Sequence, residues 1–246
     1  MNFNNGIGRR RALAIVAMIV MCVSVALAES KPEAIIPLDK LDAAGQARVR
    51  LVVPGYSFYR KVQLAHPVVR SRYDVFEYVV NHLDECSIVA QSLKIVEYRS
   101  VRRPDGSYFA DNHKGAVGCI WPLRTVPGEL LYYAQGDDRE GKMVVGCAVV
   151  LFLYHEKGPG LIEGELHGFV KIDSWVQKLL AWLFMPIVTG TVDRRFNEIV
   201  EVPVLVAEKA TAEPAKVLAV IDALPPADRE MVAEFRKLLT ASEKKP

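Results

Sequence analysis

Residues 143–172 have the sequence MVVGCAVVLFLYHEKGPGLIEGELHGFVKI, and this stretch decides the fold class. The part from Met143 to Tyr154 is apolar at almost every position, which is typical of a strand buried on both faces. The part from Leu161 to Ile172 alternates charged with apolar side chains, which predicts one polar and one apolar face. The Gly-Pro-Gly sequence between them predicts a tight turn. The stretch therefore predicts an antiparallel hairpin whose apolar face needs a cover.

The cover for this hairpin is predicted immediately downstream in the chain. Ser174 is a favourable N-cap, and the residues from Trp175 to Val202 carry a broad apolar stripe at helical spacing. Pro186 and Gly190 lie inside this stretch and predict a kink. We therefore expect a long, kinked helix packed against the sheet.

The chain before the hairpin predicts further strands and two short helices. Strands are expected at residues 58–64, 93–101, 116–122 and 129–135, where apolar and β-branched residues alternate with polar ones. Helices are expected at residues 71–81 and 84–91. In the first, Tyr73, Phe76, Val79 and Val80 recur every three or four positions and predict a buried stripe. The Arg-Pro-Asp-Gly-Ser sequence at 103–107 predicts a hairpin turn. Together these strands predict an antiparallel meander.

Helical segments are also expected near both ends of the chain. Apolar residues recur at helical spacing from Leu38 to Val52. Pro214 and Pro226 each stand where the first turn of a helix tolerates proline, and apolar residues follow both. The expected organisation is a lead and helix at 29–57, a central domain at 58–206 and a helical tail at 207–246.

The first 28 residues predict a signal peptide. Three arginines at 9–11 precede an apolar stretch at 12–23, and Ala26 and Ala28 supply the small residues that signal peptidase accepts. Cleavage after Ala28 would give an exported, periplasmic protein. An uncleaved anchor is the alternative, although the stretch is shorter than the roughly 20 residues that span a bilayer. A lipoprotein at Cys22 is a weaker alternative, because Met21 precedes this cysteine where a small residue is required.

The composition is that of a globular protein without a strong charge. Of the 246 residues, 51% are hydrophobic. The sequence has 31 basic and 29 acidic side chains, which gives a net charge of +2 at pH 7. This apolar fraction excludes an intrinsically disordered chain. Removal of the three arginines at 9–11 leaves 28 basic against 29 acidic side chains. The absence of a basic excess argues against nucleic acid as a partner.

Three cysteines, Cys86, Cys119 and Cys147, follow the predicted signal peptide. In an oxidising compartment Cys119 and Cys147 could bridge neighbouring strands, or each could stay a buried free thiol. The sequence leaves these alternatives open. No Cys-X-X-Cys motif occurs, which argues against a thiol-exchange function.

The order of a strand, two short helices, a run of antiparallel strands and a long C-terminal helix resembles the START-related helix-grip superfamily, also called SRPBCC, which includes polyketide cyclase-like and lipid-transfer proteins. The resemblance spans Tyr59 to Val206 and is carried by Ser71–Val79 for the first helix, Leu93–Tyr98 for the next strand, and Trp175–Val202 for the gripping helix. It implies an α+β fold with a curved antiparallel sheet around a kinked C-terminal helix. It also implies an apolar cavity for a lipid, sterol or aromatic ligand.

Catalytic and metal-binding motifs are not found in the sequence. The five histidines form neither a His-X-X-X-His nor a His-Glu-X-X-His group, and no Gly-X-Ser-X-Gly or phosphate-binding loop occurs. We therefore expect no metal and no cofactor. Strand alternation places Glu163, Glu165 and His167 side by side, where they could bind a cation or move protons. A solvated sheet face is the favoured interpretation of this cluster.

Aromatic side chains are the best candidates for contact with a ligand, because they can line a pocket for an apolar molecule. The candidates are Tyr98, Trp121, Tyr133, Phe152, Tyr154, Trp175, Leu179 and Trp182. Leu179 is included because it lies between Trp175 and Trp182 in the predicted helix. Ordinary core packing is the alternative for each of them. Peripheral membrane contact is a further alternative for Trp175–Met185, although Lys178 is the one basic residue in this stretch.

The sequence thus favours an exported protein that binds or carries an apolar small molecule without covalent chemistry. Two other hypotheses remain open. One is a cyclase- or hydrolase-like enzyme in which Glu165 and His167 act as acid and base. The other is an envelope protein whose terminal helices bind a protein partner that the sequence does not identify.

Overall fold

The computed structural model describes residues 32–64, 68–111, 116–138, 146–172 and 201–242. The chain divides into two units, Met1–Pro37 and Leu38–Pro246. In the first unit the described residues form one 3₁₀ turn, η2 (Pro32–Ile35). All elements discussed below belong to the second unit. Among the described residues, no helix combines the length and the apolar run that crossing a bilayer would need.

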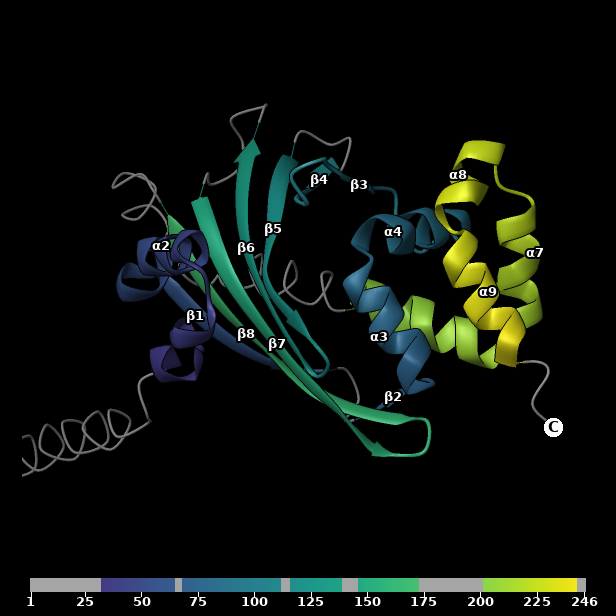
Figure 1. Ribbon diagram of the computed structural model, residues 1–246, viewed down its shortest axis with the longest axis horizontal. Coiled ribbons are helices and arrows are strands. Elements are labelled where there is room, and N and C mark those ends of the chain that lie inside the picture. Colours follow the sequence, from purple (N-terminus) through teal and green to yellow (C-terminus); the bar gives the residue numbers. More distant parts are fainter. Residues whose placement is uncertain (1–31, 65–67, 112–115, 139–145, 173–200, 243–246) are drawn as a thin grey trace, which may run out of the picture. The chain divides into compact units, whose positions relative to one another are not determined.

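The strands form one curved antiparallel sheet in the order β1-β8-β7-β6-β5-β4-β3 (Figure 1). Its members are β1 (Phe58–Gln63), β2 (Val69–Arg70), β3 (Arg99–Arg102), β4 (Tyr108–Asp111), β5 (Ala116–Val126), β6 (Glu129–Asp138), β7 (Gly146–Gly158) and β8 (Leu161–Ile172). Strands β3 to β8 each pair with their neighbour in sequence, whereas β1 and the short β2 both pair with β8. A sheet of this topology with helices packed on it confirms the α+β prediction.

Side chains alternate between two faces of the sheet, which we call the inner and the outer face. The inner face packs against α3 (Tyr73–Asn81) and α4 (Leu83–Ser92), the two helices expected between the first strands. In α3, Phe76, Val79 and Val80 of the predicted apolar stripe are at most 3% exposed, and so is Val75, whereas Tyr73 of that stripe is only partly buried. These two helices and the sheet therefore share one core.

The C-terminal helices extend that same core. Residues 201–212 are helical, and α7 (Pro214–Asp222), α8 (Pro226–Met231) and α9 (Ala233–Ser242) follow. Pro214 and Pro226 lie in the first turns of their helices, as expected. Helix α7 contacts α4 and α9 contacts α3, where the Phe235 ring stacks on that of Tyr78 at 5.5 Å. The long kinked helix predicted after Ser174 lies outside the described residues except for its last positions.

The outer face has a cover of its own, because α2 (Ala43–Val52) and the 3₁₀ turn η4 (Val53–Gly55) contact β7 and β8. Asp42 caps α2 by accepting a hydrogen bond from the N–H of Gly45 at 2.7 Å. Val49 and Val52 are at most 1% exposed, as are Leu151 and Phe169 of the sheet. Figure 1 shows α2 and α3 on opposite sides of the sheet.

The strand predicted at 93–101 is shorter than expected, since only Arg99–Arg102 forms β3. The reason lies at the end of α4. Lys94 adopts a left-handed conformation with φ of 58°, and the N–H of Ile95 donates to the carbonyl of Ala90, which closes the helix as a Schellman-type cap does. Residues 93–95 therefore end the helix, and the strand begins only at Arg99.

Side chains of α4 also protect the edge of the sheet at β3. The Ser87 hydroxyl accepts from the N–H of Ser100 at 2.9 Å and donates to its carbonyl at 3.4 Å. Because this hydroxyl satisfies both backbone groups of Ser100, this position of the edge strand is protected against pairing with another chain.

Candidate apolar binding site

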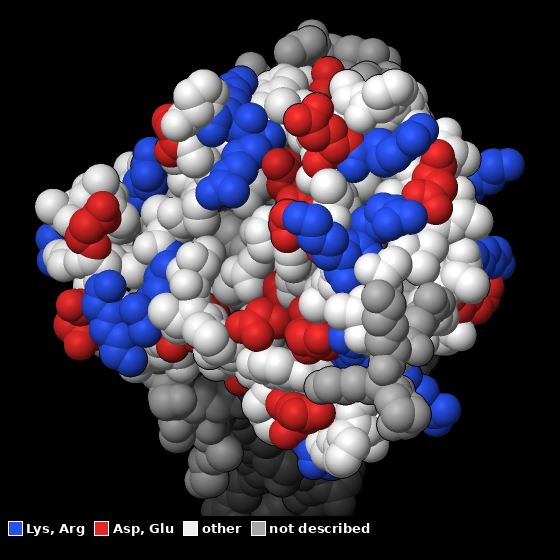
Figure 2. All heavy atoms as spheres, turned by 45° about the vertical axis from the view of Figure 1, so that its right-hand side comes forward, with Lys and Arg blue, Asp and Glu red and all other residues white. Residues whose placement is uncertain are grey.

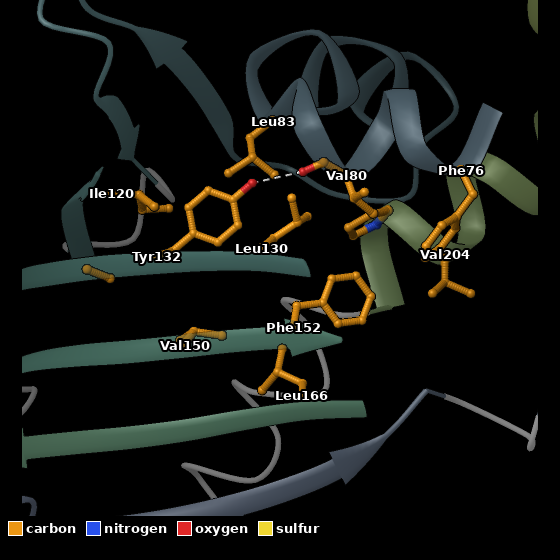
Figure 3. Close-up of a pocket in the computed structure, with 12 residues that line it drawn as sticks. Phe76, Val80, Leu83, Ile120, Leu130, Tyr132, Val150, Phe152, Leu166 and Val204 are labelled. Atoms are coloured by element: carbon orange, nitrogen blue, oxygen red, sulfur yellow. Dashed lines mark hydrogen bonds between the residues drawn. The ribbon is translucent and has the colours of Figure 1, made fainter. Parts of the chain in front are cut away.

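A cavity of about 110 Å³ lies between the inner face of the sheet and α3. Its walls come from α3, the first residue of α4, strands β5 to β8 and the helical residues 201–212. The lining consists of Phe76, Val80, Leu83, Ile120, Leu130, Tyr132, Ala134, Val150, Phe152, Leu166, Pro203 and Val204. Figure 3 shows the side chains of the strands directed toward those of α3.

The register of the sheet brings the lining residues of the strands together. Leu130, Phe152 and Leu166 are direct cross-strand neighbours on β6, β7 and β8. Tyr132 and Val150 form the next such pair on the same face. Because cross-strand neighbours point to the same side, this register makes a continuous apolar floor.

Two tyrosines fix α3 above this floor. The hydroxyl of Tyr132 donates to the carbonyl of Val80 at 3.1 Å, and that of Tyr108 donates to the carbonyl of Asn81 at 3.1 Å. Both carbonyls belong to the last turn of α3, where the helix itself offers no donors. Burial raises the pKa of both phenols above its usual value, so both remain neutral donors.

The chemistry of the lining is almost purely apolar. Tyr132 carries its one side-chain polar atom, and that hydroxyl is already bonded to the Val80 carbonyl. A charged or hydrogen-bonding ligand would lose its hydration here without compensation. An apolar cavity of similar size, about 150 Å³, stays dry and takes up benzene in another protein. The arrangement therefore suits an apolar group, and the lining residues that the structure describes offer no acid, base or nucleophile for a reaction.

The sequence-predicted contact residues are distributed over different places. Phe152 lines the cavity. Tyr154 is on the same face two residues further along β7, where its ring packs edge-on against Phe76 with centroids 5.3 Å apart. Tyr98 is partly buried and packs against the inner core. Trp175, Leu179 and Trp182 lie outside the described residues.

Trp121 and Tyr133 point away from the cavity. They are cross-strand neighbours on the outer face, with ring centroids 5.5 Å apart. The guanidinium carbon of Arg48, on α2, lies 4.9 Å from the Trp121 ring centroid and 5.8 Å from that of Tyr133. These rings therefore take part in a cation–π contact that joins α2 to the sheet.

The predicted acid–base pair, Glu165 and His167, forms a hydrogen-bonded row with Tyr59 on the outer face. His167, 4% exposed, contacts the Tyr59 hydroxyl through Nδ1 at 2.8 Å and a Glu165 oxygen through Nε2 at 2.7 Å. Glu165 also pairs with Lys61 at 2.7 Å, and these contacts lower its pKa to about 2. Glu163 is not part of the row, because it pairs with Lys157. Neither Glu165 nor His167 lines the apolar cavity.

Among the described residues, Cys86, Cys119 and Cys147 form no disulfide. Cys119 on β5 and Cys147 on β7 both pair with Gln135 of the strand between them. Two strand spacings separate them by about 10 Å, beyond the reach of a disulfide. Burial raises the pKa of the Cys86 thiol to about 12. Among the described side chains, no group of three or more His, Cys, Asp or Glu could hold a metal ion.

No protein-family model and no curated protein sequence matches the chain. Solved structures do match it. A conserved protein from Geobacillus kaustophilus has a TM-score of 0.46 at 10% identity and covers 62% of this chain and 95% of its own. A protein from Mycobacterium smegmatis has a TM-score of 0.43 at 13% identity, with 63% and 98% covered. The latter is a START superfamily protein.

A third match, Ara h 8.0201, has a TM-score of 0.40 at 7% identity and covers 66% of this chain and 98% of its own. A START superfamily protein is thus among the solved structures to which this chain is similar. At these TM-scores and identities, nothing about ligand or activity follows from the likeness.

Sequence reasoning missed most of the lining because it selected aromatic residues. The cavity is mainly aliphatic, with Leu130, Val150 and Leu166 among its walls. Phe76 and Val80 were recognised as a buried stripe and not as part of a site. Strand pairing could have identified the aliphatic residues, because it places them on the same face of the sheet as Phe152. Phe152 is the one predicted contact residue among the described lining of the cavity.

Proposed function

We propose that this protein is an exported, periplasmic binding or carrier protein for a lipid-like or other apolar small molecule, which it holds without covalent chemistry. The single observation that carries the proposal is the cavity of about 110 Å³ with its apolar lining and one satisfied hydroxyl. Affinity would come from burial of apolar ligand surface, at about 25 cal/mol per Å². The volume suits a ring or part of a hydrocarbon chain.

Titration of delipidated protein with fluorescent fatty-acid, sterol and aromatic probes tests the proposal. Ala134→Leu adds three carbon atoms to the cavity wall, so we expect it to weaken probe binding by about tenfold or more. Ala44→Leu is the matched control, since it makes the same substitution at an exposed position of α2, on the other face of the sheet, and binding should change less than about threefold. Equal binding by wild type and Ala134→Leu would reject this cavity as the site.

Export is the second part of the proposal and rests on the segment 1–28, with its arginines, apolar stretch and Ala-Leu-Ala end. Intact-mass analysis of protein from the periplasmic fraction should find a chain that starts at Glu29. A full-length chain retained in the membrane fraction would instead support the uncleaved anchor.

The hydrolase-like alternative has one observation in its favour, the row of Tyr59, His167 and Glu165, in which a histidine joins a hydroxyl to a carboxylate. It lacks a described cavity beside the row. An activity screen against ester and lactone substrates that finds turnover abolished by His167→Gln would restore this alternative. Co-purification of one stoichiometric protein without any small molecule would favour the partner-binding alternative.

A further inference from the structure

Aromatic side chains enter the apolar cavity from both the sheet and α3. Of the described residues that line it, Phe76, Tyr132 and Phe152 are aromatic. Figure 3 shows Tyr132 and Phe152 on neighbouring strands and Phe76 on the helix. The ring centroids of Phe76 and Phe152 lie 6.1 Å apart at an interplanar angle of 62°. Rings of the sheet and of the helix therefore meet at the cavity.

An aromatic ligand makes contacts with these walls that a saturated ligand cannot make. Aromatic rings attract one another at centroid distances of about 4.5–7 Å when they are offset or edge to face. Phe76 makes such contacts with Phe152 and, at 5.3 Å, with Tyr154. A ligand ring beside Phe76 and Phe152 extends this cluster, whereas a saturated ring of the same size gains only from burial.

The volume limits the ligand to about one ring. The cavity measures about 110 Å³, which is less than the roughly 150 Å³ of an engineered cavity that holds benzene in another protein. Its floor offers no further room, because Leu130 and Leu166 are at most 3% exposed. The bond from the Tyr132 hydroxyl to the Val80 carbonyl fixes α3 on the other side. Fused-ring sterols and long acyl chains therefore exceed the space.

The polarity of the walls excludes a ligand with hydrogen-bonding groups. None of the lining side chains that the structure describes is charged, and the Tyr132 hydroxyl is bonded to the Val80 carbonyl. A hydroxyl or carboxylate on the ligand ring would lose its hydration without a described partner. The cavity therefore favours a plain hydrocarbon ring over its polar derivatives.

The surface also lacks a field that would gather an ionic ligand. Figure 2 shows acidic and basic side chains intermixed on the side of the molecule that carries the C-terminal helices, without a large area of one sign. Attraction of a charged ligand over a distance needs such an area. On this side of the molecule, the surface therefore matches an uncharged ligand.

We propose that the cavity selects a monocyclic aromatic hydrocarbon of the benzene class and excludes sterols and long acyl chains. This inference rests on the proposed binding function and specifies its ligand class. Phe76 and Phe152 contact the ligand ring through their own rings, and the floor at Leu130 and Leu166 buries it. No hydrogen bond and no charge takes part in recognition.

Calorimetric titration of the delipidated full chain with benzene tests the inference. We expect saturable binding, and cyclohexane should bind at least about threefold more weakly, because it cannot form edge-to-face contacts. Phenol should bind at least about tenfold more weakly than toluene, since a hydroxyl replaces a methyl group of similar size.

Two pairs of variants place the binding in this cavity. Ala134→Leu should weaken benzene binding by about tenfold or more, whereas the exposed Ala44→Leu should stay within about twofold of wild type. Phe152→Leu keeps an apolar wall and removes one ring, so the preference for benzene over cyclohexane should fall. The exposed Leu51→Ala on α2 should leave that preference unchanged.

Equal affinity for benzene and cyclohexane, or for toluene and phenol, would overturn the inference. Equal benzene binding by wild type and Ala134→Leu would overturn it as well. If fatty-acid or sterol probes bind and benzene does not, the inference fails and the proposed binding function stands. If none of these molecules binds, both fail.

Discussion

Leu151 and Phe152 are consecutive residues of β7, yet they lie in two different kinds of surroundings. Leu151 points to the outer face, where it is 1% exposed in the packing beneath α2. Phe152 points to the inner face and borders a cavity of about 110 Å³ beneath α3. The same sheet thus carries close packing on one side and an apolar cavity on the other.

The difference is explained by how each covering helix is held. Helix α2 rests on the outer face through the small side chains Val49 and Val52, which let it approach closely. Helix α3 is fixed through its last carbonyls by the hydroxyls of Tyr108 and Tyr132. These long side chains hold the end of α3 at a set height above the sheet, and short residues such as Ala134 do not fill the gap.

Replacement of Leu151 by alanine should have the largest effect. The outer face is closely packed, so Leu151→Ala should leave a new void and lower the free energy of unfolding by about 3 kcal/mol. Urea denaturation followed by circular dichroism measures this loss. A loss below about 1 kcal/mol would mean that the outer face is as loosely packed as the inner one.

The equivalent change on the inner face should cost less. Leu130 already borders a cavity, so Leu130→Ala should lower the free energy of unfolding by about 2 kcal/mol, because fewer packing contacts are lost. It should also enlarge the cavity, and a bulky apolar probe should raise the midpoint of thermal unfolding more than in wild type. An equal loss in both leucine variants, with no gain from the probe, would contradict the contrast between the faces.

The hydrogen-bonded row of the outer face should make the free energy of unfolding depend on pH in the acidic range. The pKa of Glu165 falls from 4.5 to about 2 on folding, because Lys61 and His167 favour the carboxylate. Its contribution is therefore complete above pH 4.5 and is lost as the pH falls through 2. After allowance for partial exposure, we expect about 1 kcal/mol.

Denaturant titrations at pH 6, 4 and 2.5 measure this dependence. Glu165→Gln should remove the part of the slope that belongs to this group. Glu230→Gln, at an exposed residue of α8, is the control and should not change the slope. An unchanged slope in Glu165→Gln would show that other carboxylates dominate the acid response.

The smallest expected effect concerns the cation–π contact that joins α2 to the sheet. Arg48→Met keeps an unbranched apolar side chain over Trp121 and removes the charge, so it should lower the free energy of unfolding by about 0.5 kcal/mol. Arg50→Met on the same helix is the control, since Arg50 is exposed and bonds only to Gln46 among the described residues. Equal losses in both variants would indicate that charge over the ring contributes nothing.

Local sequence predicted the elements that depend on short-range physics. The hairpin with its turn at 158–160, the stripe of α3 and the helices opened by Pro214 and Pro226 all appear where periodicity and turn residues placed them. The strand at 93–101 was wrong in part, because the cap at Lys94 uses the residues that the pattern assigned to the strand.

The sequence by itself therefore determined the α+β class, the strand pairing of the hairpins and the apolar faces of the helices. Only the tertiary structure decided which face of each strand meets which helix. It put Tyr132 toward the cavity and its neighbour Tyr133 toward α2. Alternation along a strand fixes only that neighbours point to opposite sides. The side that becomes a site is set by contacts between residues far apart in the chain.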